Sequence, residues 1–157
     1  MPFEDPRCLS CHRCCVETEM ILLREDIDRI LSLGYPRSYF VAKKGPFHVL
    51  RNVGGRCVFL RGDGRCSIYP YRPLGCRAYP LVFDEGRGPL IDDLCPLARE
   101  FERRCSDVVH ALRILRRVLL GLERDYGYRV DWPLFEEGSR LLLYRACRAS
   151  GGLLYGP

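Results

Sequence analysis

The chain has 157 residues, 47% of them hydrophobic and 29% charged, with ten cysteines. This composition is typical of one globular domain with a modest core, and it excludes a disordered chain. The formal net charge of +5 treats the cysteines as neutral thiols. Thiolates bound to metal would lower that charge, so it gives no support to nucleic-acid binding.

The segment 8–15 holds four cysteines in the pattern C-x2-C-x2-C-C, at Cys8, Cys11, Cys14 and Cys15. Two-residue gaps let one short loop turn several thiolates onto one metal centre, as tetrahedral zinc and iron–sulfur sites require. Neighbouring side chains diverge and rarely ligate one ion together. The doublet of Cys14 and Cys15 therefore favours two metal ions, or a cluster with several irons, over one simple zinc finger.

A disulfide framework is the alternative interpretation, because ten cysteines would suit a small secreted protein. The first seven residues do not resemble a signal peptide, and no apolar run approaches the roughly 18 residues of a membrane span. We therefore expect a cytoplasmic protein, in which thiols more often ligate metal. The chain has 23 Arg and two Lys, which fits a GC-rich genome or growth at high temperature, and hyperthermophiles do keep intracellular disulfides.

The segment up to residue 97 predicts short elements joined by turns. Residues 25–34 have acids in the first turn and a final glycine, which indicates a short helix. Residues 47–53 and 56–60 are predicted to form a hairpin that turns at the glycines between them. A second glycine-rich turn at 61–64 would bring Cys57 close to Cys66.

Residues 69–73 contain two prolines and predict a turn, or the first turn of a short helix that carries Cys76. The pattern after residue 97 is helical. Apolar residues recur at steps of three and four with arginines between them, which predicts one long amphipathic helix through Phe101, Cys105, Val108, Val109, Leu112, Leu115, Val118, Leu119 and Leu122.

That helix is predicted to end near Tyr126 and Gly127. A second helix should begin after residues 131–133 and close at Gly151 and Gly152. Cys105 and Cys147 fall on the apolar faces of these two helices. We interpret them as buried core residues rather than ligands, because a free cysteine packs as a small hydrophobic side chain.

These elements predict a single α+β domain. Its loop-rich, metal-nucleated part, residues 1–97, would hold short β-hairpins and short helices, and residues 98–157 would add two amphipathic helices packed on it. The candidate metal ligands all lie in the first part: Cys8, Cys11, Cys14, Cys15, Cys57, Cys66, Cys76 and Cys95.

Thiolate-only ligation is predicted for this set. A bacterial ferredoxin pattern would need a cysteine where Thr18 stands, and the three histidines are too scattered for a zinc finger of the two-cysteine, two-histidine type. Eight thiolates divide into two zinc sites of four, or into one 4Fe-4S cluster and four thiols of another use. His12 lies within the first loop and is expected beside the ligands or exposed.

The order of the cysteine motifs resembles the YkgJ-type cysteine-cluster family of zinc- or iron-chelating domains. The resemblance covers residues 8–96 and rests on the first cluster followed by Gly55-Arg56-Cys57, Gly64-Arg65-Cys66, Arg72-Pro73-Leu74-Gly75-Cys76 and Cys95-Pro96. It implies a metal or iron–sulfur domain but no particular reaction. Together with the doublet, it favours an iron–sulfur centre over zinc.

Three residues flank Cys76 and are expected near the bound group: Arg72, Arg77 and Tyr79. An arginine beside thiolates would offset their charge or hold an anionic substrate, and we favour a supporting structural role. No motif for hydrolysis, phosphoryl transfer or nicotinamide chemistry is present.

Three function classes follow from these observations. The first is an iron–sulfur protein with a redox or accessory role for a separate modifying enzyme, which would be its protein partner. The second is a zinc-stabilised interaction module without catalysis, and the third is a metal carrier. The residues leave open whether the protein is itself an enzyme.

Overall fold

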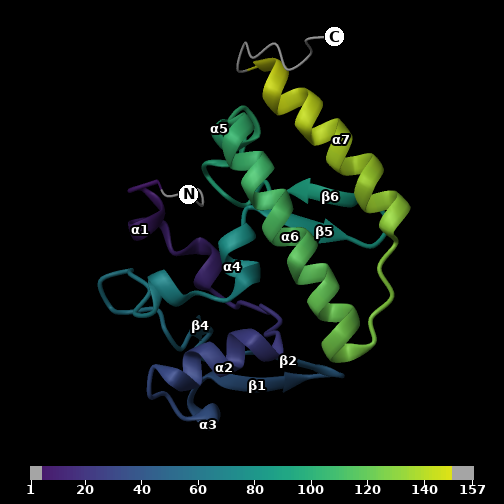
Figure 1. The fold of residues 1–157 in the computed structure, drawn as a ribbon. Helices are drawn as coiled ribbons and strands as arrows, with labels where there is room; N and C mark the ends of the chain where they lie inside the picture. Colours follow the sequence, from purple (N-terminus) through teal and green to yellow (C-terminus); the bar gives the residue numbers. More distant parts are fainter. Residues whose placement is uncertain (1–4, 150–157) are drawn as a thin grey trace.

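The computed structural model describes residues 5–149 and shows an α+β fold (Figure 1). The helical segments are α1 (Cys8–Cys11), the 3-10 helix η1 (Arg13–Cys15), α2 (Arg24–Ser32), α3 (Arg37–Phe40), the 3-10 helix η2 (Tyr69–Tyr71), α4 (Leu74–Ala78), α5 (Ala98–Glu102), α6 (Cys105–Tyr126) and α7 (Trp132–Ala149). The strands are β1 (Val41–Lys44), β2 (Phe47–Leu50), β3 (Asn52–Val53), β4 (Arg56–Cys57), β5 (Leu81–Asp84) and β6 (Gly88–Ile91).

The predicted turn at Gly54 and Gly55 is confirmed, with φ of +59° and +75°, values that glycine adopts without strain. It joins β3 to β4, which pair antiparallel. The single strand predicted over 47–53 is wrong. Its first half, β2, pairs with β1 instead, and the Arg51 N–H extends that pairing by donating to the Phe40 carbonyl at 2.8 Å.

Helix α2 confirms the helix predicted over 25–34, and the glycine that follows it, Gly34, has φ of +97°. The second turn is also confirmed, since the Gly64 N–H donates to the Arg61 carbonyl at 3.0 Å and Leu60 bridges Cys66. The proline-rich segment forms η2 and then leads into α4, which carries Cys76 as predicted.

The predicted continuous helix through Phe101 is wrong. It is broken into α5 and α6 at Arg103 and Arg104, where Arg104 has an extended backbone with φ of −97° and ψ of 94°. No glycine or proline marks the break. Tertiary contacts set it, because Phe101 is fully buried and the Arg104 guanidinium lies 3.8 Å from the Asp5 carboxylate.

The predicted end of α6 is confirmed by Gly127, which has φ of +64°. Helix α7 begins at Trp132 with Pro133 in its first turn, and its predicted close at Gly151 and Gly152 lies outside the described residues. None of the helices within residues 5–149 has the length and apolar character that a membrane-spanning segment needs.

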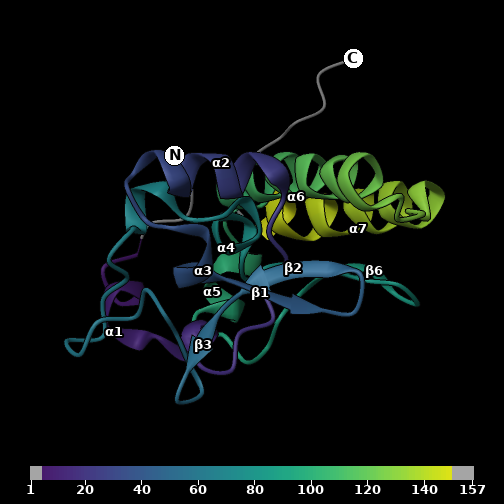
Figure 2. The ribbon, with the colours of Figure 1, turned by 90° about the horizontal axis from the view of Figure 1, so that it is seen from below.

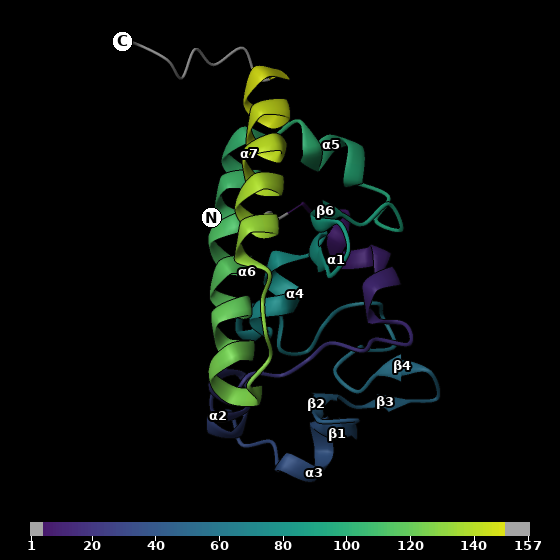
Figure 3. The same ribbon diagram turned by 90° about the vertical axis from the view of Figure 1, so that its right-hand side faces the viewer.

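Helices α6 and α7 run side by side along one side of the molecule, and the β1–β4 hairpins lie on the other (Figure 3). Figure 2 shows the same helix pair beside α4 and the hairpins from below. The hairpin of β5 and β6, which the sequence did not predict, packs against α6 and α7.

Two groups of buried side chains make up the core. The first, here the helical core, joins α4 and β5 to α6 and α7 and includes Leu74, Leu81, Cys95, Phe101 and Leu115. The second, here the hairpin core, packs α2 and α3 against the hairpins and includes Ile30, Phe40, Leu50, Cys57 and Phe59. The helical core draws on both sides of residue 97, so the two parts of the chain fold against each other.

Candidate metal centre

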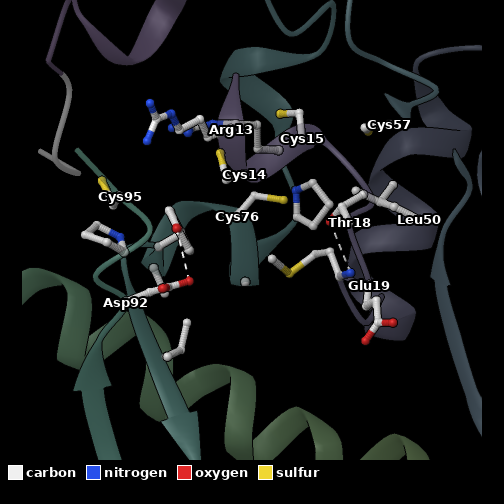
Figure 4. Close-up of a pocket in the computed structure, with 18 of the residues that line it drawn as sticks. Arg13, Cys14, Cys15, Thr18, Glu19, Leu50, Cys57, Cys76, Asp92 and Cys95 are labelled. Atoms are coloured by element: carbon white, nitrogen blue, oxygen red, sulfur yellow. Dashed lines mark hydrogen bonds between the residues drawn. The ribbon is translucent and has the colours of Figure 1, made fainter. Parts of the chain in front are cut away.

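One cavity of about 780 Å³ is lined by every candidate ligand named above, although these cysteines span residues 8–95 of the chain. All eight are free thiols. Figure 4 shows Cys95 at one end of the cavity and Cys57 at the other, with Cys14, Cys15 and Cys76 between them. The disulfide framework is therefore absent from this set.

The first loop is shaped by local backbone bonds. The Cys8 N–H donates to the Asp5 carbonyl at 2.8 Å and starts α1. His12, which also lines the cavity, has φ of 47°, a left-handed conformation that turns the chain from α1 into η1. Four thiols are thereby presented within eight residues.

The other four thiols arrive from separate elements. Cys57 ends β4, and Cys66 is placed by its bridge to Leu60. Cys76 lies within α4. Cys95 is placed by a turn in which its N–H donates to the Asp92 carbonyl at 3.2 Å.

Burial keeps most of these thiols protonated in the metal-free protein. It raises the pKa of Cys57, Cys66, Cys76 and Cys95, and it raises the pKa of Cys8 to about 11. A metal that binds here must therefore displace protons.

The doublet behaves differently. A hydrogen bond from the Cys15 thiol lowers the pKa of Cys14 to about 7, and the same bond raises the pKa of Cys15. Cys14 is exposed, whereas Cys15 is partly buried. Cys14 is the thiol that ionises most readily among those whose pKa is shifted.

The donor set fits a soft metal, because thiolates are the ligands that zinc and iron–sulfur clusters prefer. Within residues 5–149, no three His, Cys, Asp or Glu side chains form a ready-made ion site. The eight thiols line one cavity. Their ligation of metal stays a prediction.

Arg72 and Tyr79, two of the residues that flank Cys76, line the cavity. The Arg72 guanidinium lies 3.8 Å from the Tyr69 ring centre, and its Nε donates to the Tyr69 carbonyl at 3.0 Å. The Tyr79 hydroxyl donates to the Asp92 carboxylate at 3.1 Å.

Arg77 is not among the lining residues. Adjacent residues on an α-helix point about 100° apart, so Arg77 leaves α4 on another face than Cys76. Its charge instead lies near His110 of α6, whose pKa is lowered by burial and then by neighbouring cations. The expectation that Arg77 lies beside the bound group stays a prediction.

Cys105 and Cys147 lie outside the cavity lining, and they form a disulfide with an S–S distance of 2.03 Å. The prediction that they are free core thiols is wrong. Periodicity placed both on apolar helix faces, but it could not show that α6 and α7 bring these two positions together.

Asp26 supports the site and was not identified from the sequence, where it counted only as an acid in a first helical turn. Its side chain is 0% exposed. Its carboxylate accepts from the Leu23 N–H and the Leu74 N–H, both at 3.0 Å, and from Arg29 at 2.6 Å. Asp26 thereby fixes the start of α4, two residues before Cys76.

Searches of curated proteins and of solved structures returned no match. A family model named CxxCxxCC, with the description "Putative zinc- or iron-chelating domain", matches residues 7–96. The matched segment exceeds half of the 157 residues and contains every thiol of the cavity. The chain therefore belongs to the CxxCxxCC family of zinc- or iron-chelating domains.

Proposed function

We propose that this protein holds an iron–sulfur centre in the cysteine cavity and serves a separate enzyme in a redox or accessory role. The observation that carries the proposal is the gathering of eight free thiols, one doublet among them, around one cavity of about 780 Å³. A single four-coordinate zinc ion needs only four of them. Membership of a zinc- or iron-chelating family supports metal binding as such.

An iron–sulfur cluster bound here would supply one-electron transfer. The protein would surround such a cluster with apolar side chains and would balance the negative charge of its thiolates. The rest of the lining is largely apolar and reaches α6 through Leu115 and Leu119. Burial raises the pKa of Cys66 and Cys76, and the nearby Arg72 charge acts in the opposite direction. Arg72 would therefore favour the thiolate forms that ligation needs.

Metal and sulfide content of protein purified without oxygen tests this proposal. We expect a brown protein whose visible absorption bleaches on reduction. Cys76→Ser should lose iron, while the double variant Cys105→Ala/Cys147→Ala, altered outside the cavity, should keep it. Colourless protein with stoichiometric zinc would replace the proposal by the zinc module, readily exchanged metal would indicate a carrier, and absence of metal would refute metal binding.

The redox role is tested by a matched pair of arginine variants. Arg72→Ala removes a positive charge beside the thiolates and should lower the reduction potential of the centre. Arg77→Ala, on the same segment but outside the lining, should leave it unchanged. Equal potentials in both variants would contradict a tuning role for Arg72.

A cytoplasmic location and a protein partner complete the proposal. The eight free thiols favour a reducing compartment, although the bond between Cys105 and Cys147 needs an oxidant or a potential low enough to resist reduction. Affinity capture with the metal-loaded full chain, compared with the Cys76→Ser variant, should recover the partner enzyme only with the loaded protein.

A further inference from the structure

We propose that the cavity contains two separate four-thiolate sites and that the doublet is divided between them. This inference rests on the proposed metal-binding function. The first site consists of Cys8, Cys11, Cys14 and Cys95, and the second consists of Cys15, Cys57, Cys66 and Cys76.

The two cores of the molecule separate six of the eight thiols in this way. Cys95 belongs to the helical core, and Cys8 packs against it. Cys57 belongs to the hairpin core, and Cys15, Cys66 and Cys76 pack against that one. Since the two cores are distinct groups of buried side chains, the second set has its own supporting wall, and so do Cys8 and Cys95 of the first. Cys11 follows Cys8 within α1.

The two ends of the first loop are held by different parts of the molecule, one by α5 and the other by the hairpins. The Arg7 guanidinium forms two hydrogen bonds with the Glu100 carboxylate, at 2.9 and 2.6 Å, which tether the start of α1 to α5. Helix α5 begins three residues after Cys95. The beginning of the loop is thereby held next to the segment that carries the last cysteine.

The end of the same loop is tied to the hairpins. Val16 bridges Arg56, and the Glu17 N–H donates to the Gly55 carbonyl at 2.6 Å. These bonds hold the residue after Cys15 next to the residue before Cys57. The left-handed His12 lies between the two tethers, where the chain passes from one side to the other.

The doublet of Cys14 and Cys15 lies at the boundary between the two proposed sets of thiols. Cys15 is partly buried and packs, together with Cys66 and Cys76, against the hairpin core, to which Cys57 belongs. Cys14 is exposed and lies between Cys95 and Cys15 (Figure 4). Once Cys15 completes the second set of four, Cys14 remains as the fourth donor for Cys8, Cys11 and Cys95. Each set matches one tetrahedral ion or one four-iron cluster.

Cobalt(II) distinguishes two sites from one, because it substitutes for zinc and absorbs visibly when four thiolates hold it in a tetrahedron. The metal-free full chain, titrated without oxygen, should bind two equivalents. Cys95→Ser and Cys57→Ser should each bind one, and Cys105→Ala/Cys147→Ala should still bind two. Circular dichroism establishes that each variant is folded, and Cys8→Ser and Cys66→Ser repeat the test if a first variant does not fold.

Double variants test the membership of the sets. Cys14→Ser/Cys95→Ser, within one proposed site, should still bind one equivalent. Cys14→Ser/Cys57→Ser, across the two sites, should bind none. Cys15→Ser/Cys57→Ser should again keep one equivalent.

Loss of all cobalt from both Cys95→Ser and Cys57→Ser, or one equivalent in the unaltered chain, would indicate a single shared centre and overturn the inference. The proposed division of the doublet would be overturned if Cys15→Ser/Cys57→Ser bound no cobalt and Cys14→Ser/Cys57→Ser kept one equivalent. These outcomes leave metal binding intact. Failure of the unaltered chain to bind cobalt, zinc or iron would instead refute the proposed function.

Discussion

Cys14 gives the metal-free protein one thiol that should react faster than its neighbours. Its pKa of about 7 makes it largely a thiolate at pH 8 and largely a thiol at pH 6. We expect its alkylation by iodoacetamide to rise about tenfold between these two pH values, as the thiolate fraction does. Cys8, with a pKa of about 11, should stay nearly unreactive over this range. Pulsed labelling followed by peptide mass spectrometry measures both.

The control for this prediction removes the hydrogen-bond donor. Cys15→Ala should return the pKa of Cys14 towards the ordinary value for cysteine, so its labelling at pH 7 should slow. Labelling of Cys57 as fast as that of Cys14 would show that Cys57 does not stay buried in the metal-free protein.

Among the polar residues near the centre, Asp26 is expected to lose the most unfolding free energy when it is replaced. Asp26→Ala leaves the Leu23 and Leu74 N–H groups without their acceptor and leaves Arg29 without its carboxylate. Loss of such a buried network costs about 3 kcal/mol of unfolding free energy. Denaturant titration of the metal-free protein measures it.

Asp28 provides the matched control, since it is an exposed acid on the same helix. Asp28→Ala should change the unfolding free energy by less than about 0.5 kcal/mol. Similar values for the two variants would mean that Asp26 does not anchor α4.

At the scale of the elements, we predict that the disulfide between α6 and α7 stabilises the fold without affecting the metal centre. It joins residues 42 positions apart, and closing a loop of that length restricts the unfolded chain by about 4 kcal/mol. The double variant Cys105→Ala/Cys147→Ala should lose up to this amount of stability in thermal or denaturant unfolding. Its metal content should not change, because neither cysteine lines the cavity. Metal loss without destabilisation would contradict this assignment.

Local sequence signals predicted the elements that glycine and proline delimit. The turn at Gly54 and Gly55, the helix stops at Gly34 and Gly127, and the start of α7 all have backbone requirements that single residues reveal. The hairpin of β5 and β6 escaped prediction. Pro89 lies within β6 and cannot donate a ladder hydrogen bond, so the segment does not resemble an ordinary strand.

Features that depend on distant contacts could not be predicted in this way. The break between α5 and α6 leaves the apolar periodicity intact, and the disulfide depends on how two helices pack. The cysteine spacing predicted the donor set, and the structure places all of it around one cavity. The sequence could not reveal the tether from Arg7 to Glu100, because these residues lie 93 positions apart. It could not reveal the role of Asp26 either, because Leu74, which donates to it, lies 48 positions away.

At the scale of the whole molecule, metal should hold the loop-rich side together. Structural thiolate sites couple binding to folding, so a chelator should lower the melting temperature. Trypsin should then cut first at exposed arginines of the loops, such as Arg13, Arg56 and Arg65. Helices α6 and α7 should stay protected by their packing and their disulfide. Mass spectrometry of timed digests, with and without chelator, tests this order, and first cleavage within α6 would contradict it.

The distance along the chain between the first loop and Cys95 also matters during synthesis. Cys15 leaves the ribosome 80 residues before Cys95, which corresponds to about 4–16 s at ordinary translation rates. During that interval the nascent chain exposes four closely spaced thiols whose distant partners have not all been synthesised. A metal or an oxidant that meets them then acts on an incomplete ligand set, so loading of all eight thiols must follow the emergence of Cys95.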